Sequence, residues 1–113
     1  SLDNQNNIAF VKAFKEMWGD DMVVGAEPQA AYLGPWLWKA AVEKAGSFDV
    51  DKVREASPGI ELQSAPEGYV RIHASHPLWS KTRVGKAQAD GQYEVVFETS
   101  ELVEPDPFPE GYQ

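Results

Sequence analysis

Apolar residues recur at intervals of three or four through the first part of the chain, which is typical of a helix with one buried face. The residues at this helical spacing are Ile8, Val11, Phe14 and Trp18. The spacing predicts a helix over residues 7–18. Asn6 or Asn7 is the expected N-cap, because short polar side chains accept hydrogen bonds from free N–H groups. Gly19 is the expected end of this helix.

A second helical pattern runs from about Pro28 to Ala45 and ends at Gly46. Its apolar residues surround the helix axis: Ala30, Ala31, Tyr32, Leu33, Trp36, Leu37, Trp38, Ala40, Ala41 and Val42. A helix that is apolar on every side is typically buried. We therefore expect other elements to cover it on more than one face.

A short third helix is expected after Asp49, which is placed to cap it. From residue 60 the period changes to that of strands. Residues 60–63 are compatible with a short strand, and residues 65–68 are a turn. In the next strand Val70 and Ile72 share one side.

Two alternating segments near the C-terminus predict a β-hairpin. They span residues 82–88 and 92–98, on either side of Ala89-Asp90-Gly91. An Asp-Gly pair between alternating runs is a strong hairpin signal. Residues 101–113 are acidic and rich in proline, which favours an extended tail lying on a surface.

Composition excludes several classes of function. The 113 residues carry a net charge of −8, and a strongly acidic chain without a basic stripe is not expected to bind nucleic acid. The sequence has no cysteine, so a disulfide framework and thiolate chemistry are excluded. No apolar run approaches the ~20 residues that a membrane-spanning helix needs.

Residues suited to metal binding or catalysis are few. His73 and His76 have a spacing that places two ligands together on a helix, but they fall in a strand and a loop. A solvated loop is therefore the favoured interpretation, and we expect no metal site. The sequence has no Gly-x-Ser-x-Gly nucleophile motif and no glycine-rich phosphate loop. We expect no catalytic residues and no cofactor, and hence no enzyme.

The four tryptophans have two interpretations. Aromatic rings stack on ligands, but they also fill cores. Trp18, Trp36 and Trp38 lie at core spacing on helices, so packing is the expected role. Trp79 is expected in a loop beside Pro77 that packs on a neighbouring part of the protein.

The candidate ligand-binding residues are Glu27, Gln29 and Tyr32, at the start of the second helix. Free N–H groups and polar side chains meet at a helix start, where they can contact a small molecule. The alternative is structural: a carboxylate such as Glu27 is favoured at a helix N-terminus, and Tyr32 is a core residue.

The order of these elements resembles the C-terminal part of the type I periplasmic solute-binding proteins, most closely the branch that binds urea and short-chain amides. The segments that carry the resemblance are NIAFVKAFK (7–15), QAAYLG (29–34), LWKAAVEKAG (37–46), DVDKVREA (49–56), APEG (65–68), RVGKAQADGQY (83–93) and PDPFP (105–109).

The resemblance implies an α/β fold, a fragment of a receptor with two lobes joined by crossing segments. Residues 1–100 would be its C-terminal part, mostly elements of the first lobe plus the hairpin at the last crossing, with residues 101–113 as a tail. The loop before Gln29 would lie near the cleft between the lobes. The chain would be the C-terminal third of the protein, so export cannot be judged from its first residues.

The same resemblance implies a function and a location. The protein would be the periplasmic or extracytoplasmic binding subunit of an ABC importer, with a small neutral polar solute (urea or an amide) and the membrane permease as partners. Two alternatives remain open: a branched-chain amino-acid receptor of the same family, and a free-standing small interaction domain.

The apolar second helix also bears on the state of the isolated chain. Its expected cover would be partly absent, and the strands of the second half would have open edges. Exposed apolar patches and open edges favour association. We therefore expect the isolated chain to be a homodimer, with exchange of the strand half as one route.

Overall fold

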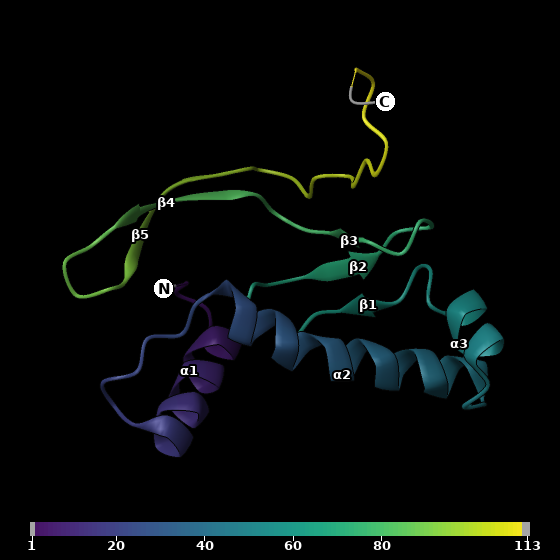
Figure 1. Ribbon diagram of the computed structural model, residues 1–113, viewed down its shortest axis with the longest axis horizontal. Coiled ribbons are helices and arrows are strands. Elements are labelled where there is room, and N and C mark those ends of the chain that lie inside the picture. The colour runs from purple at the N-terminus through teal and green to yellow at the C-terminus, as the bar shows by residue number, and fades with distance from the viewer. Residues whose placement is uncertain (1, 112–113) are drawn as a thin grey trace.

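The computed structural model describes residues 2–111 (Figure 1). Over that range the chain forms three helices followed by five short strands. Their bounds are α1 (Gln5–Trp18), α2 (Ala26–Ala45), α3 (Val50–Ala56), β1 (Glu61–Leu62), β2 (Val70–Ile72), β3 (Leu78–Trp79), β4 (Arg83–Ala87) and β5 (Tyr93–Glu98). This mixture of helices and small antiparallel sheets agrees with the expected α/β class.

Helix α1 begins two residues earlier than the sequence predicts, because its cap is Asn4. The Asn4 side chain accepts a hydrogen bond from the N–H of Asn7 at 2.9 Å and donates one to the carbonyl of Pro66 at 3.0 Å. The expectation that Asn6 or Asn7 is the cap is therefore wrong. Asn7 lies inside the first turn and is buried. Gly19 ends the helix at φ 116°, as expected.

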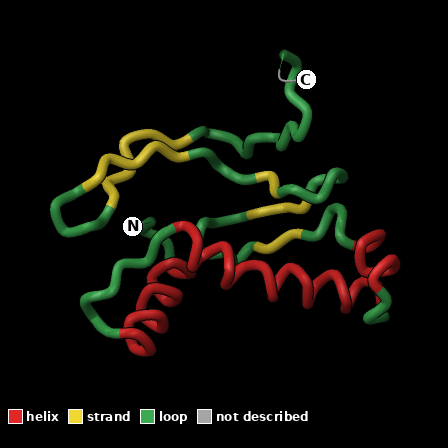
Figure 2. The backbone as a smooth tube through the Cα atoms, in the orientation of Figure 1, coloured by secondary structure: helices red, strands yellow, loops and turns green. Residues whose placement is uncertain are grey.

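The core lies between α2 and the three-stranded antiparallel sheet β1–β2–β3 (Figure 2). Leu33 and Ala41 from α2 contact this sheet, and Val70 and Ile72 face them from β2. The alternation in β2 thus confirms the expected common side of Val70 and Ile72. Burying such side chains contributes about 1.5–3 kcal/mol each, so this layer is the main source of stability.

The ends of α2 and α3 also agree with the sequence. Gly46 stops α2 in the left-handed conformation at φ 61°, where a residue without Cβ is unstrained. The Asp49 side chain then accepts a hydrogen bond from the N–H of Lys52 and starts α3. Helix α3 packs beside the end of α2.

The expected burial of α2 on more than one face is wrong for this chain. Tyr32, Trp36 and Trp38 are 42%, 48% and 55% exposed. The reason is the small amount of sheet: β1, β2 and β3 cover one side of α2 and leave the other open. Trp18 on α1 is also exposed. The expected core role of Trp18, Trp36 and Trp38 is therefore not met within this chain.

Trp79 lies in strand β3 and not in a loop. Its backbone pairs with Arg71 of β2, and the Arg71 guanidinium lies 4.9 Å from the centre of the indole ring. The sequence does not reveal β3, because two residues are too few for a visible alternation.

The predicted hairpin is confirmed as β4–β5, with Gly91 in its turn at φ 83°. A bulge interrupts the pairing between Val84 and Gly85. After the hairpin, the tail runs back along the chain, and Val103 bridges to Ser80. The described part of the tail, up to residue 111, contains no helix or strand, in keeping with the expected extended form.

We expect Val70→Ala to lower the free energy of unfolding by about 2 kcal/mol, since two buried methyl groups are lost and a cavity remains. Val70 is 0% exposed. The matched control is Val50→Ala on α3, where the side chain is 78% exposed and the change should stay within about 0.5 kcal/mol. Guanidinium unfolding measures both, and equal losses would contradict the assigned core.

Candidate functional site

Polar side chains from three regions meet around Arg83, at the start of β4. We call this set the Arg83 junction, and it consists of Gln29, Glu67, Lys81, Arg83 and Glu98. Arg83 donates from Nη2 to the carbonyl of Glu67 at 2.9 Å and from Nε to the Glu98 carboxylate. Lys81 Nζ donates to the same carboxylate at 2.9 Å. Gln29 Nε2 donates to the Glu67 carboxylate at 3.2 Å.

Local structure places Glu67 and Glu98 beside Arg83. The turn at 65–68 is closed by a hydrogen bond from the N–H of Gly68 to the carbonyl of Ala65, and Gly68 has φ 103°. This turn places the carbonyl of Glu67 within hydrogen-bond distance of Arg83 and its carboxylate within hydrogen-bond distance of Gln29. The bulge in the hairpin shifts the pairing by one residue, which sets Glu98 opposite Arg83.

The electrostatics of the junction centre on Glu98. Hydrogen bonds from Lys81, and then from Arg83, hold the pKa of the Glu98 carboxyl below its ordinary value. These bonds favour the charged form, so Glu98 is a carboxylate at neutral pH. Two cations share this one carboxylate, and Arg83 retains N–H donors beyond the two that it uses here.

Three hollows adjoin Arg83, with volumes of 470, 270 and 600 Å³. The largest lies between the loop before α2 and the hairpin, and Glu27, Arg83 and Gln92 line it. The smallest is lined by Gln29 and Glu67 together with apolar residues of α1. Volumes of this order suit small molecules, and the few polar groups in each wall can orient one.

The predicted ligand residues divide between two places. Glu27 is exposed and Gln29 half-buried, and they border neighbouring hollows beside Arg83. Tyr32 is absent from the walls of these hollows. The structure therefore brings Glu27 and Gln29 near one another but separates Tyr32 from them.

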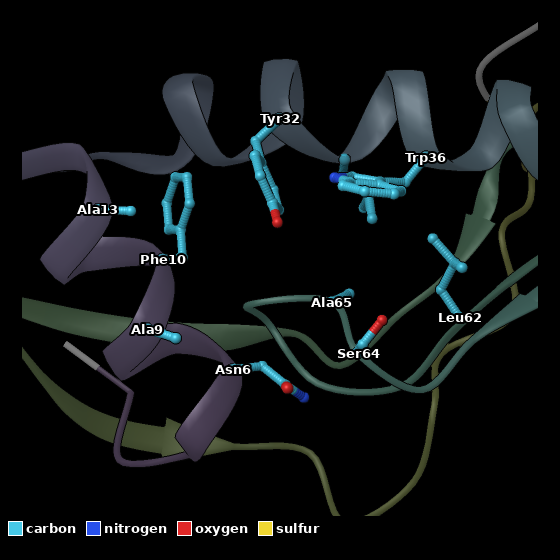
Figure 3. Close-up of a pocket in the computed structure, with 10 residues that line it drawn as sticks. Asn6, Ala9, Phe10, Ala13, Tyr32, Trp36, Leu62, Ser64 and Ala65 are labelled. Atoms are coloured by element: carbon cyan, nitrogen blue, oxygen red, sulfur yellow. The ribbon is translucent and has the colours of Figure 1, made fainter. Parts of the chain in front are cut away.

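Tyr32 belongs to an aromatic groove between α1, α2 and the 64–65 turn (Figure 3). Its ring lies 4.8 Å from that of Phe10 and 6.2 Å from that of Trp36, between centroids. Asn6 and Ser64 are the polar side chains in the wall of this 360 Å³ hollow. Figure 3 shows the rings of Phe10, Tyr32 and Trp36 side by side, facing Asn6 and Ser64 across the groove.

The two histidines have different surroundings. His73 Nε2 lies 3.1 Å from a Glu104 carboxylate oxygen, and Nδ1 lies 2.7 Å from Ser75 Oγ. His76 is an exposed turn residue at φ 76°. Within residues 2–111, no three His, Cys, Asp or Glu side chains form a group that could hold a metal ion.

Arg83 was not among the site residues predicted from the sequence. A lone arginine at the start of a strand carries no signal, and the three-residue loop 89–91, which pairs Gln88 with Gln92, would set Arg83 opposite Phe97 if the register continued unchanged. Only the bulge brings Glu98 into place. The one available clue was the cluster of Lys81, Arg83 and Glu98 at the base of the predicted hairpin.

The chain is an α/β segment in which a small sheet covers one side of α2. The other side of α2 exposes aromatic residues, and polar hollows lie at the base of the hairpin. A profile of the periplasmic binding protein domain family matches residues 1–113. The chain belongs to this family. None of the described helices is long and apolar enough to cross a membrane.

The chain is also similar to a protein named limonene hydroxylase from Geobacillus stearothermophilus. The two are 28% identical over 103 residues, which is 91% of this chain and 19% of that protein. The chain thus spans about a fifth of the length of that relative.

We expect acidification to weaken the junction through Glu98. Because its pKa is lowered from 4.5 in the folded protein, its stabilisation is complete above that value and is lost as the pH falls through the lowered pKa. In Glu98→Gln, the free energy of unfolding should therefore fall less between neutral pH and about pH 3. Guanidinium unfolding across this range measures the effect. The control is Glu55→Gln on α3, and the same flattening in both variants would contradict the assignment.

Proposed function

We propose that this chain is the C-terminal part of an extracytoplasmic solute-binding subunit of an ABC importer, which holds urea or a similar small amide between two lobes. Family membership carries this proposal. Residues 1–100 supply mostly first-lobe elements and the last crossing, and residues 101–113 form the tail. The open aromatic face of α2 and the hollows beside Arg83 support it, since both need further polypeptide to enclose them.

The polar groups near the hollows have the chemistry that an amide requires. Urea carries one carbonyl acceptor and several N–H donors, and each group buried without a partner costs about 1–3 kcal/mol. The Glu27 carboxylate and the Gln29 carbonyl oxygen are acceptors for N–H groups, and Arg83 has donors for a carbonyl. The remaining partners come from the rest of the receptor.

Ligand capture follows from closure of the two lobes about the crossing segments. A polar solute held by one wall remains in water, whereas closure removes water and strengthens each hydrogen bond. Closure also creates the surface that docks on the membrane permease.

A branched-chain amino-acid receptor is the second candidate, and one observation favours it. Glu27 and Arg83 line the same 600 Å³ hollow. An amino acid needs an anionic partner for its ammonium and a cationic partner for its carboxylate, and these two residues have those charges. Arg83 is already paired with Glu98, which favours a neutral solute over a zwitterion.

We infer that this segment supplies no catalytic group. The similar protein is named a hydroxylase, but the match covers 19% of it. The activity in that name therefore belongs to a much longer polypeptide. A free-standing interaction domain is disfavoured by the uncovered α2, which a complete domain would bury.

A thermal-shift panel on the full-length receptor tests the solute. We expect urea, acetamide or formamide to raise the melting temperature, and leucine to have no effect. A ligand at one hundred times its dissociation constant stabilises the native state by about 2.7 kcal/mol. Glu27→Ala should reduce the shift, because an acceptor for N–H groups is lost.

Glu55→Ala, an exposed glutamate on α3, is the matched control and should leave the shift unchanged. An unaltered ligand profile in Glu27→Ala would remove Glu27 from the site. A shift produced by leucine alone would replace the amide proposal with the amino-acid one.

We expect the isolated chain to be a homodimer. Its accessible surface is 8069 Å², whereas a compact monomer of this mass exposes about 6,200 Å². Its radius of gyration is 16.0 Å, against about 13 Å for a compact domain of this length. The excess of about 1,900 Å² per chain lies within the roughly 1,000–2,500 Å² that each subunit of an obligate homodimer buries.

Sedimentation equilibrium measures this association. Trp36→Lys on the open face of α2 should weaken it, while Lys39→Glu on an exposed polar position of the same helix should not. A stable monomer at high concentration would contradict the prediction and favour the free-standing domain.

A further inference from the structure

The hairpin is joined to the rest of the chain by a narrow neck of two extended segments. Residues 80–82 lead into β4, and residues 99–103 leave β5. The N–H of Thr99 donates to the carbonyl of Thr82 at 3.0 Å, and the N–H of Val103 to that of Ser80 at 2.9 Å. Figure 1 shows β4–β5 extending from this neck beyond the β1–β3 sheet, and Gly91 and Gln92 of the hairpin line a hollow together with the loop before α2.

Apolar packing does little to fix the direction of the hairpin. Val84, Val96 and Phe97 are between 52% and 55% exposed. The closely packed element pairs of the described chain lie within the hairpin, within the β1–β3 sheet and between α2 and α3. The orientation of the hairpin therefore depends on the neck, on polar contacts beside it, and on the loop before α2, where Val23 lies beside Gly91.

Arg83 makes a polar contact that crosses from the hairpin to the rest of the described chain. One edge of its guanidinium binds Glu98 on β5, and Nη2 binds the carbonyl of Glu67 in the 65–68 turn. The Glu67 carboxylate in turn accepts from Gln29 in the first turn of α2. The Arg83 side chain is only 20% exposed, so its position is well defined.

The planar guanidinium suits this task because its donors point in fixed directions. Binding a strand carboxylate and a turn carbonyl together fixes both the distance and the angle between the two parts. A lysine at this position has one nitrogen and no fixed fork, so it can keep the charge of Arg83 but cannot make the same two-sided contact.

We propose that Arg83 is a positioning residue, a latch that holds the β4–β5 hairpin in one orientation relative to α2 and the 65–68 turn. The hydrogen bond to Glu98 orients the guanidinium, and the Glu67 carbonyl accepts a hydrogen bond from it. The consequence for lobe closure rests on the proposed function: the latch would set the angle at which this crossing enters the second lobe. The latch itself is a property of the chain without ligand.

Distance measurements between spin labels test the latch directly. The chain has no cysteine, so Lys86→Cys on β4 and Glu55→Cys on α3 give unique labelling sites. Labelled chain is diluted with unlabelled chain to suppress distances between copies. We expect a single narrow distance peak in the parent and loss of that peak in Arg83→Gln and in Arg83→Lys.

Arg54→Gln is the matched control, because Arg54 pairs with Asp51 on the surface of α3, and its peak should stay narrow. Should Arg83→Gln fail to fold by circular dichroism, Arg83→Lys and Glu98→Gln decide the question, and both should lose the peak. A narrow peak in Arg83→Lys would overturn the proposal, since charge alone would then suffice. All of these measurements are made without ligand, so failure to bind urea would overturn the proposed function and leave the latch standing.

Discussion

The packing of α2 against β1–β2–β3 is the constraint on which the rest of the structure depends. Leu33 and Ala41 contact the sheet from the helix, and Val70 and Ile72 complete the layer. Each strand of this sheet has only two or three residues, so it covers one side of a twenty-residue helix and no more. The aromatic groove is the direct consequence, because Tyr32 and Trp36 stay on the uncovered side.

Because the core covers only one side of α2, apolar and polar side chains are exposed in different parts of the chain. Apolar groups without cover gather on α2, and polar groups gather where the hairpin leaves the sheet. Neither region encloses a molecule by itself. A solute held by Glu27, Gln29 or Arg83 needs a facing wall, as lobes that close about a crossing would provide. This geometry suits the proposed function, in which this chain would supply architecture and part of one pocket wall.

Features set by neighbouring residues, such as helix ends and strand faces, were predicted well from the sequence. Features set by distant segments, such as burial and strand register, were predicted less well. Gly19, Gly46 and Asp49 mark helix ends because their conformation or hydrogen bonding acts within one turn. The alternation of Val70 and Ile72 fixes a strand face for the same reason. The sequence could not reveal which tryptophans are covered, since cover depends on how much sheet exists elsewhere. Nor could it reveal the bulge that sets Glu98 opposite Arg83, because the turn at Asp90-Gly91 fits either register.

The Arg83 junction shows why a weak interaction can still control geometry. Partly exposed ion pairs contribute little to stability, because water and salt screen them. The Arg83 fork nevertheless restricts direction, since it binds Glu98 and the Glu67 carbonyl at the same time. In the proposed receptor, such a contact would set the direction of the hairpin while contributing little to the stability of the fold.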